Sequence, residues 1–311
     1  MTKYVFGIDI GGTTIKMGLF DAAGEVLDKW EIETRTHNNG ENIVPDIAKA
    51  VKAKMEEKGI ATEDVIGAGV GVPGPVNDSG IVQGCVNLGW GKVNVSKDLG
   101  DRLGMKVSAG NDANVAALGE MWKGGGQGYR HLVVATLGTG VGGGIILDGK
   151  IVNGFAGAAG EIGHIHVQDG EEATCGCGNK GCLEQYASAT GIVRLAERKL
   201  ASTTVKTKLK AGNVTAKDVW DAVKDGDLIA QHIADEFGQY LGKGLAAITA
   251  VTNPEVIVIG GGVSKAGEVL IEYVQKYYKE YVFPGSRETK FALATLGNDA
   301  GIFGAAKLVL G

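Results

Sequence analysis

Three of the chain's four cysteines stand close together in a C-x-C-x4-C pattern, at Cys175, Cys177 and Cys182. Thiolates are soft ligands, so three of them at this spacing favour Zn²⁺, which takes four ligands in a closed structural site. Two histidines, His164 and His166, precede the cysteines. On an extended segment these two side chains point to opposite faces, so we expect only one of them to complete the ligand set.

Glutamates flank this segment at Glu161 and Glu184. A purely structural zinc site does not require them. The segment is therefore compatible with a structural metal site, with a reaction centre, or with a structural metal site that shapes a reaction centre. Three buried thiols without a metal are the alternative for the cysteines.

Three glycine clusters each follow an apolar run: DIGGTTIK at 9–16, LGTGVGGG at 137–144 and GGGV at 260–263. Glycine lets backbone N–H groups approach an anion closely, and threonine hydroxyls add donors. Asp9, at the end of its strand, suits a hard cation such as Mg²⁺. None of the clusters is a Walker A loop or a G-x-G-x-x-G motif. One such loop could be an ordinary tight turn, but packing alone does not readily explain three.

Asp112 lies in the segment GNDAN (110–114), where a strand runs into a helix with Asn111 at its N-cap. A helix N-terminus stabilises an ionised carboxylate. Asp112 could serve the helix dipole alone. It could also act as a weak general base, which suffices for phosphoryl transfer because positioning and charge neutralisation do most of the work there.

Apolar strands alternate with helical patterns along the chain, which predicts an α/β fold. The hairpin formed by the strands at 4–10 and 15–21 has a counterpart further on: Gly11 aligns without a gap with Gly138, and residues 18–21 align with residues 145–148. This suggests a duplicated architecture, although two glycine-rich hairpins could match by coincidence. We further expect strands at 25–34, 65–73 and 106–112, and helices at 42–58 and 227–250.

The length of 311 residues allows two domains, and the net charge of −5 argues against nucleic-acid binding. The N-terminus does not read as a signal peptide, and no apolar run is long enough to cross a membrane. Clustered cysteines indicate metal binding in a reducing compartment. We therefore expect a cytoplasmic protein without membrane partners.

The three glycine motifs together resemble the phosphate-1, phosphate-2 and adenosine motifs of the actin, Hsp70 and sugar-kinase superfamily. The segment GAAGEIGHIHV…CGCGNKGCLEQYAS resembles the signature of the ROK family of bacterial sugar kinases and sugar-sensing repressors. The resemblance covers essentially the whole chain. It implies a two-domain, actin-like (ribonuclease H-like) α/β fold with an interdomain cleft. The expected domains are residues 1–115 with 297–311, and residues 116–296 with the zinc site.

The resemblance also implies roles for individual residues. Asp112 would be the general base, and His164 would be the histidine ligand of a structural Zn²⁺ beside the three cysteines, because the family pattern is G-E-x-G-H. The sugar-binding residues would be Asn87, Asn111, Asp112, Glu161, His164 and Glu184. The residues binding ATP and Mg²⁺ would be Asp9, Gly11, Gly12, Thr13, Thr14, Lys16, Gly138, Thr139, Gly140, Gly261 and Gly262.

The implied activity is ATP-dependent phosphorylation of glucose at its 6-hydroxyl. Kinases for fructose, mannose, allose or N-acetylmannosamine share these motifs, so another hexose stays open. A non-catalytic sugar sensor is a further alternative, which we expect to carry an additional N-terminal DNA-binding element. An actin- or Hsp70-like ATPase would have no reason to carry the Cys₃His cluster with its glutamates. The family resemblance also implies a homo-oligomer, either a dimer or a tetramer.

Overall fold

The computed structural model describes residues 3–311, which divide into two compact units. The first unit contains the chain up to Gly128 together with Gly144–Gly160 and Leu296–Gly311, and the second contains Tyr129–Gly143 and Glu161–Thr295. From the sequence we expected the second domain to begin at residue 116. In the structure the first unit continues to Gly128 and holds the whole of α4 (Asp112–Lys123).

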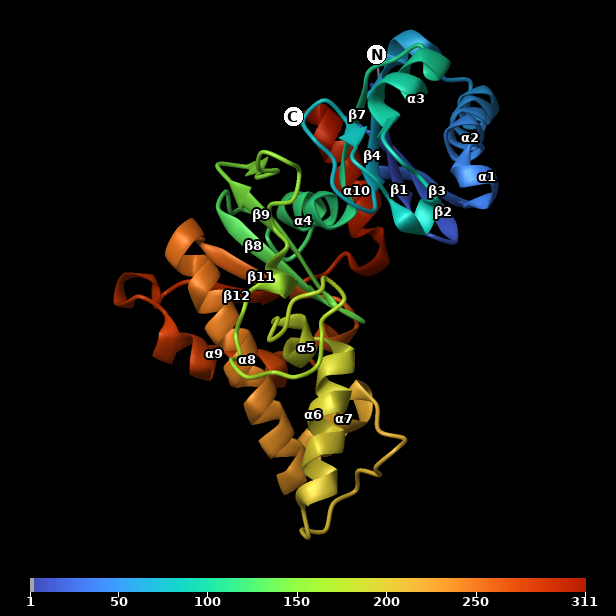
Figure 1. Ribbon diagram of the computed structural model, residues 1–311. Coiled ribbons are helices and arrows are strands. Elements are labelled where there is room, and N and C mark those ends of the chain that lie inside the picture. The colour runs from blue at the N-terminus through green and yellow to red at the C-terminus, as the bar shows by residue number, and fades with distance from the viewer. Residues whose placement is uncertain (1–2) are drawn as a thin grey trace. The chain divides into compact units, whose positions relative to one another are not determined.

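The first unit is built on a five-stranded sheet in the order β3-β2-β1-β4-β7 (Figure 1). The first three strands in sequence form an antiparallel meander, and β4 and β7 continue the sheet in parallel with β1. All five strands lie where the sequence predicted them: β1 (Tyr4–Ile10), β2 (Thr14–Asp21), β3 (Val26–Glu33), β4 (Val65–Val72) and β7 (Val107–Asn111).

Helices and shorter elements complete this unit. They are α1 (His37–Gly40), α2 (Ile43–Lys58), η1 (Thr62–Asp64), β5 (Ile81–Val82), η2 (Val86–Leu88), β6 (Val93–Asn94), α3 (Val95–Leu103), η6 (Gly297–Asp299) and α10 (Ala300–Leu310). The predicted helix at 42–58 is confirmed as α2, whose buried side chains recur at helical spacing.

The two faces of the first sheet are covered by different helices. Strand side chains alternate between faces, so Phe6 and Ile8 join the core under α2 and α3, while Val5 and Phe20 pack with α10. On the α10 face, Gly7 and Gly69 let the helix backbone lie directly on the sheet. A Cβ atom added at Gly69 would fall 1.7 Å from the carbonyl oxygen of Ala305. This close approach brings the start of α10 to the end of β1, where Asp9 lies.

A second five-stranded sheet has the order β10-β9-β8-β11-β12. Its strands are β8 (Leu132–Leu137), β9 (Val141–Leu147), β10 (Lys150–Ile151), β11 (Val256–Gly260) and β12 (Lys290–Leu293). The order repeats that of the first sheet: three sequential strands lie side by side, followed by two that continue from the first of the three. The duplicated architecture predicted from the aligned hairpins is therefore confirmed at the level of strand order.

The helices of the second unit include the predicted long amphipathic helix, which is confirmed as α8 (Leu228–Thr252). The others are η3 (Ile162–His164), α5 (Glu184–Ala187), α6 (Ala189–Ser202), α7 (Ala216–Lys224), η4 (Gly262–Ala266), α9 (Glu268–Tyr281) and η5 (Pro284–Ser286). Among residues 3–311, we find no helix whose length and apolar character would let it cross a membrane.

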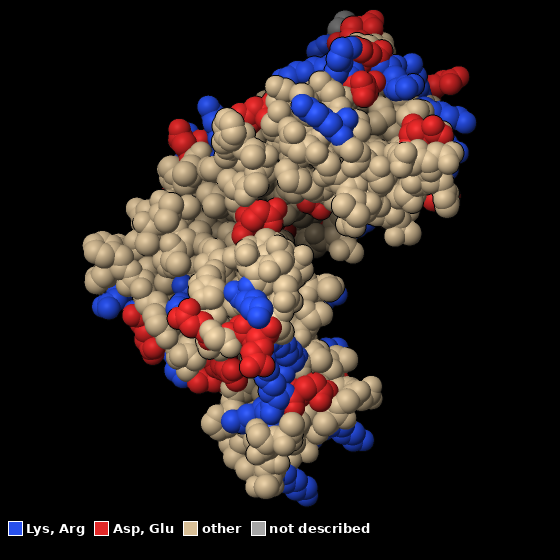
Figure 2. All heavy atoms as spheres, viewed as in Figure 1, with Lys and Arg blue, Asp and Glu red and all other residues tan. Residues whose placement is uncertain are grey.

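Acidic and basic side chains are interspersed on the face drawn in Figure 2. Proteins that bind nucleic acid gather Lys and Arg on one continuous surface. Among its described residues, this face shows no such continuous basic surface, in keeping with the net charge of −5.

Candidate active site and metal centre

The turn between β1 and β2 is held at its base and open at its tip. Gly11 N donates to Thr14 O over 3.0 Å, and Thr34 Oγ1 donates to Gly11 O over 2.7 Å. Gly12 and Thr13, at the tip, are exposed. The loop is thus fixed by its neighbours while its tip, with the backbone N–H of Gly12 and Thr13, is accessible to a ligand.

Asp9 stands at the end of β1, with its carboxylate against the first turn of α10. A Cβ atom added at Gly301 would lie 2.4 Å from the Asp9 carboxylate. Burial and the negative charge of Asp112 raise the pKa of Asp9 to about 6, although the Lys16 ammonium acts in the opposite direction. Lys16 is paired with Asp9 across the hairpin and donates to Asn298 O over 3.1 Å. A buried carboxylate that is hard to ionise is a suitable place for a cation.

Asn111 and Asp112 form the start of α4 as predicted. The side chain of Asn111 caps the helix by accepting from Asn114 N over 3.1 Å, and its amide donates to Asp112 Oδ1 and to Gly74 O, each over 3.1 Å. Asp112 Oδ1 also accepts from Ala113 N over 2.8 Å. These bonds fix the Asp112 carboxylate at the helix N-terminus.

The same corner of the first unit contains Asp9. A Cβ atom added at Gly71 would lie 3.5 Å from Asp9 Oδ1 and 3.7 Å from the Cα atom of Asp112. Both aspartates therefore flank the end of β4. The fold thus brings together two predicted site residues, Asp9 and Asp112, that are far apart in the sequence.

Asn87 lies exposed in η2, at the tip of a turn closed by two backbone hydrogen bonds between Cys85 and Trp90 of 2.9 Å each. Trp90 is buried and its indole donates to Gly40 O over 3.2 Å. The ring therefore packs the loop. Cys85 is a buried free thiol.

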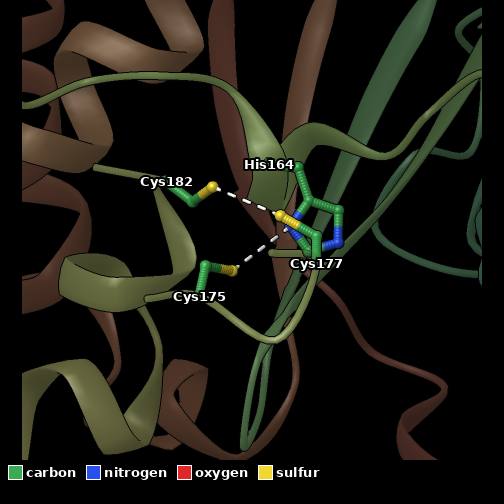
Figure 3. Close-up of side chains that lie close together, drawn as sticks. All are labelled: His164, Cys175, Cys177 and Cys182. Carbon is green, nitrogen blue, oxygen red and sulfur yellow. Dashed lines mark hydrogen bonds between the residues drawn. The ribbon is translucent and has the colours of Figure 1, made fainter. Parts of the chain in front are cut away.

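His164 and the three cysteines converge in the second unit (Figure 3). Their ligand atoms all lie within 4.8 Å of one another; His164 Nδ1 is 3.7 Å from Cys175 Sγ, and Cys177 Sγ is 3.6 Å from Cys182 Sγ. Zn–S bonds of about 2.3 Å in a tetrahedron separate two sulfur atoms by about 3.8 Å. The donor set and its spacing therefore fit Zn²⁺.

The contacts of the two histidines show which of them is the ligand candidate. His166 is exposed, and its ring nitrogens contact Lys180 O at 3.0 Å and Asp169 Oδ1 at 2.9 Å. His164 instead turns Nδ1 toward the sulfur atoms. Both nitrogens of His166 are engaged elsewhere, so His164 is the histidine of the cluster.

The cysteines differ in environment. Burial and the nearby Glu184 raise the pKa of Cys175 to about 12, and burial raises the pKa of Cys182. The backbone N–H of Asn179 lowers the pKa of the exposed Cys177. A metal would have to displace the thiol protons to bind here, which couples its binding to pH.

Glu161 and Glu184 approach the cluster on its histidine side. Glu161 Oε2 is 3.9 Å from His164 Nε2, and Glu184 Oε1 is 3.7 Å from His164 Nδ1. Cys175 Sγ donates to Glu184 Oε1 over 2.9 Å. The two predicted sugar-binding glutamates and the predicted metal ligands thus form one group.

Glu171 is a structural residue that the sequence did not single out. Its side chain is only 4% exposed and contacts Tyr186, Arg194 and Arg198. Burial alone would raise the pKa of Glu171, but hydrogen bonds from Tyr186, Ala173 N and Arg194 lower it to about 2. This ionised carboxylate ties the loop that carries the cysteines to α6.

The second glycine loop, between β8 and β9, lies against the start of α6. Ala189 N donates to Gly138 O over 2.8 Å, and Thr190 Oγ1 donates to Thr139 O over 2.7 Å. A Cβ atom added at Gly140 would lie 2.6 Å from Glu184 Oε2. A side chain at this position would displace the Glu184 carboxylate.

The third glycine cluster borders a cavity of about 370 Å³ in the second unit. A Cβ atom added at Gly261 would lie 2.5 Å from Leu137 O, while Gly262 lines the cavity itself. Trp220 of α7 is among the other lining residues, with Ala189, Thr215, Ala216, Lys217, Asp221, Lys224, Val263, Lys265 and Ala266. The sequence identified the glycines but not Trp220.

Known proteins resemble this chain along its whole length. A glucokinase from Halalkalibacterium halodurans is 44% identical over 99% of this chain and 95% of that protein. The crystal structure of a ROK hexokinase from Thermus thermophilus matches with a TM-score of 0.81 and 31% identity, covering 98% of this chain and 97% of the other. That of a ROK family glucokinase from Streptomyces griseus, in complex with glucose and AMPPNP, matches with a TM-score of 0.74 and 34% identity, covering 98% of each chain.

The strand order of the two sheets agrees with the actin-like α/β fold that the sequence resemblance implied, and these solved structures confirm that fold class. The sequence profile of the ROK family matches residues 5–311. The chain therefore belongs to the ROK family.

Proposed function

We propose that this ROK protein is an ATP-dependent glucokinase that transfers the γ-phosphoryl group of ATP to the 6-hydroxyl of glucose. The observation that carries the proposal is the fixed Asp112 carboxylate at the N-terminus of α4, in the same corner of the first unit as Asp9. Its relatives named glucokinases support the choice of sugar.

Asp112 acts in this proposal as the general base. Its Oδ1 atom is occupied by Ala113 N and the amide of Asn111, so the carboxylate is held in one orientation. It accepts the proton of the sugar 6-hydroxyl as that oxygen attacks phosphorus and the bond to the leaving ADP oxygen breaks. A weak base suffices, because the proton leaves late in such a reaction. Asn111 and Asn87 bind sugar hydroxyls.

Asp9 and the glycine loops hold the phosphoryl donor. Asp9 would bind Mg²⁺ through water, since a partly buried carboxylate beside a second aspartate gains from a nearby cation. Such a cation supplies charge neutralisation on the donor phosphates. The phosphate oxygens are bound by backbone N–H groups and by side-chain donors. These belong to Gly11, Gly12, Thr13, Thr14, Lys16, Gly138, Thr139 and Gly140.

The cavity beside Gly261 and Gly262 receives the adenine ring. Its volume of about 370 Å³ is ample for a purine, and the ring of Trp220 and several alanines give it apolar walls. Lys217, Lys224 and Lys265 add positive charge around it, which suits a nucleotide.

Cys175, Cys177, Cys182 and His164 would hold a structural Zn²⁺ that shapes the sugar pocket. A closed Cys₃His set leaves no position for a reacting water, so the metal would fold the loop and not catalyse. Cys175 now donates its thiol proton to Glu184. A bound metal would take the place of that proton, so the Glu184 carboxylate, like that of Glu161, would be available to accept hydrogen bonds from sugar hydroxyls.

The sugar is the part of the proposal that other ROK kinases leave open, so initial rates of ATP consumption should be measured with glucose, mannose, fructose, allose and N-acetylmannosamine. We expect the highest kcat/KM with glucose. 6-Deoxyglucose serves as the control, because it can bind but has no 6-hydroxyl to accept a phosphoryl group. A clear preference for another hexose would replace glucose in the proposal, and no sugar-dependent turnover would favour a sensor. We also propose a homo-oligomer, on the family resemblance alone, and a cytoplasmic location, which the clustered cysteines favour.

A further inference from the structure

The first turn of α6 holds the loop between β8 and β9 by two hydrogen bonds. Ala189 N donates to Gly138 O over 2.8 Å, and the Thr190 hydroxyl donates to Thr139 O over 2.7 Å. Thr190 is exposed and contributes nothing to the core. Its hydroxyl therefore links the start of α6 to the loop.

The start of α6 is in turn fixed to the segment that carries the metal cluster. Ser188 is fully buried, donates from Oγ to Glu184 O over 2.6 Å, and caps α6 by accepting from Gly191 N over 2.9 Å. Its Oγ atom is also 2.9 Å from Thr190 Oγ1. A change in the position of Glu184 would therefore be passed to Ser188 and Thr190.

Glu184 joins the cluster to the loop a second time, through its side chain. One carboxylate oxygen accepts from Cys175 Sγ over 2.9 Å. The other lies so close to Gly140 that an added Cβ atom would be 2.6 Å away. The loop is thus bonded to α6 at Gly138 and Thr139 and lies against the Glu184 carboxylate at Gly140, and the same carboxylate contacts the metal cluster.

We propose that the Cys₃His cluster positions the Gly138–Gly140 loop as well as Glu161 and Glu184. The path from cluster to loop runs through Glu184 and Ser188, and Thr190 is the positioning residue at its end. This rests on the proposed function, in which that loop binds the phosphates of the nucleotide. Loss of the metal or of the Thr190 hydroxyl then weakens nucleotide binding, an effect that a role confined to the sugar pocket would not produce.

Thr190→Val tests the proposal because valine keeps the shape of threonine and removes the hydroxyl, and with it the bond to Thr139 O and the contact with Ser188 Oγ. Mg-ADP and glucose affinities should be measured separately by calorimetry, with zinc content measured on the same samples. We expect Mg-ADP to bind about fivefold more weakly, the loss of roughly one hydrogen bond, with glucose affinity and zinc content unchanged. Thr190→Ser should restore Mg-ADP binding.

Thr252→Val is the matched control. Thr252 makes the same kind of hydroxyl-to-carbonyl bond, to Ile248 O over 2.9 Å, at the far end of α8. This variant should bind Mg-ADP as the wild type does. Unchanged Mg-ADP affinity in Thr190→Val would overturn the role of Thr190.

Cys177→Ser tests the metal end of the path. We expect loss of zinc and weaker binding of both glucose and Mg-ADP. In the double variant Cys177→Ser/Thr190→Val, the loss of Mg-ADP affinity should be smaller than the sum of the losses in the two single variants, because both changes act on one loop. If zinc loss weakens glucose binding alone, the coupling is refuted while the kinase proposal stands. If the wild type binds no Mg-ADP, it is the proposed function that fails.

Discussion

Replacing Asp9 by asparagine removes a negative charge that the folded protein disfavours. Burial and the charge of Asp112 raise the pKa of Asp9 from its usual 3.8 to about 6. Asparagine has nearly the same shape and needs no ionisation. We therefore expect Asp9→Asn to stabilise the free protein near neutral pH while impairing Mg-ATP-dependent turnover, because the carboxylate is retained for binding rather than for folding.

The size and pH range of this effect follow from the pKa. A rise of about two pH units is worth about 3 kcal/mol of unfolding free energy. Below pH 4 the carboxyl is protonated in both the folded and the unfolded state, so it carries no penalty. As the pH rises through 4 to 6, the unfolded state ionises first and the folded state loses relative stability. Above pH 6 the penalty is constant, and the pKa of about 6 from which it follows already includes the opposing effect of Lys16.

Urea unfolding of the wild type and Asp9→Asn at pH 8 and pH 4 measures this directly. We expect the variant to be more stable by about 2 to 3 kcal/mol at pH 8 and equal at pH 4. Asp21→Asn is the control on the same hairpin, since Asp21 Oδ1 accepts from Ala23 N and Glu25 N and an amide oxygen can do the same. A variant less stable than the wild type at pH 8, or a difference that does not change with pH, would show that the ionised Asp9 carboxylate does not destabilise the fold.

Three further substitutions test the fold and the metal site. Gly69→Ala would place Cβ 1.7 Å from Ala305 O and should destabilise the protein by about 3 kcal/mol or more, whereas Gly91→Ala meets open space and should not, as denaturant melts will show. Glu171→Gln removes the negative charge opposite its two arginine partners and should destabilise the protein by about 3 kcal/mol at pH 7. This difference disappears as the wild-type carboxylate is protonated below pH 4.5 toward pH 2. Metal analysis should find one zinc per chain in the wild type and none in Cys177→Ser; a wild type without zinc would contradict the ligand assignment.

The sequence predicted the elements whose signals are local. Strands with apolar runs, the α2 and α8 helices and the Asn111 cap all appear where expected. Periodicity and capping depend on neighbouring residues, so one chain segment contains the whole signal. The aligned hairpins also predicted the repeated strand order, because a duplication leaves the same sequence pattern at two places in the chain.

Features that depend on distant partners were not predictable. Glu171 stands among several acidic residues in a polar loop, and only contacts with α6 decide which of them is buried. Trp220 became a candidate only when η4 placed Gly262 in the same cavity. The choice of His164 over His166 came from family resemblance, and the structure supplies its reason in the contacts of His166 with Lys180 and Asp169.

The most direct test of the account is the turnover of Asp112→Asn with saturating glucose and Mg-ATP, measured beside its affinity for glucose. An asparagine oxygen can still accept from Ala113 N and the Asn111 amide, so the local structure should persist. We expect kcat to fall by about 10²- to 10⁴-fold, the usual contribution of a general base, with glucose affinity nearly unchanged. A variant that keeps appreciable turnover would contradict the role of Asp112 and with it the proposed mechanism.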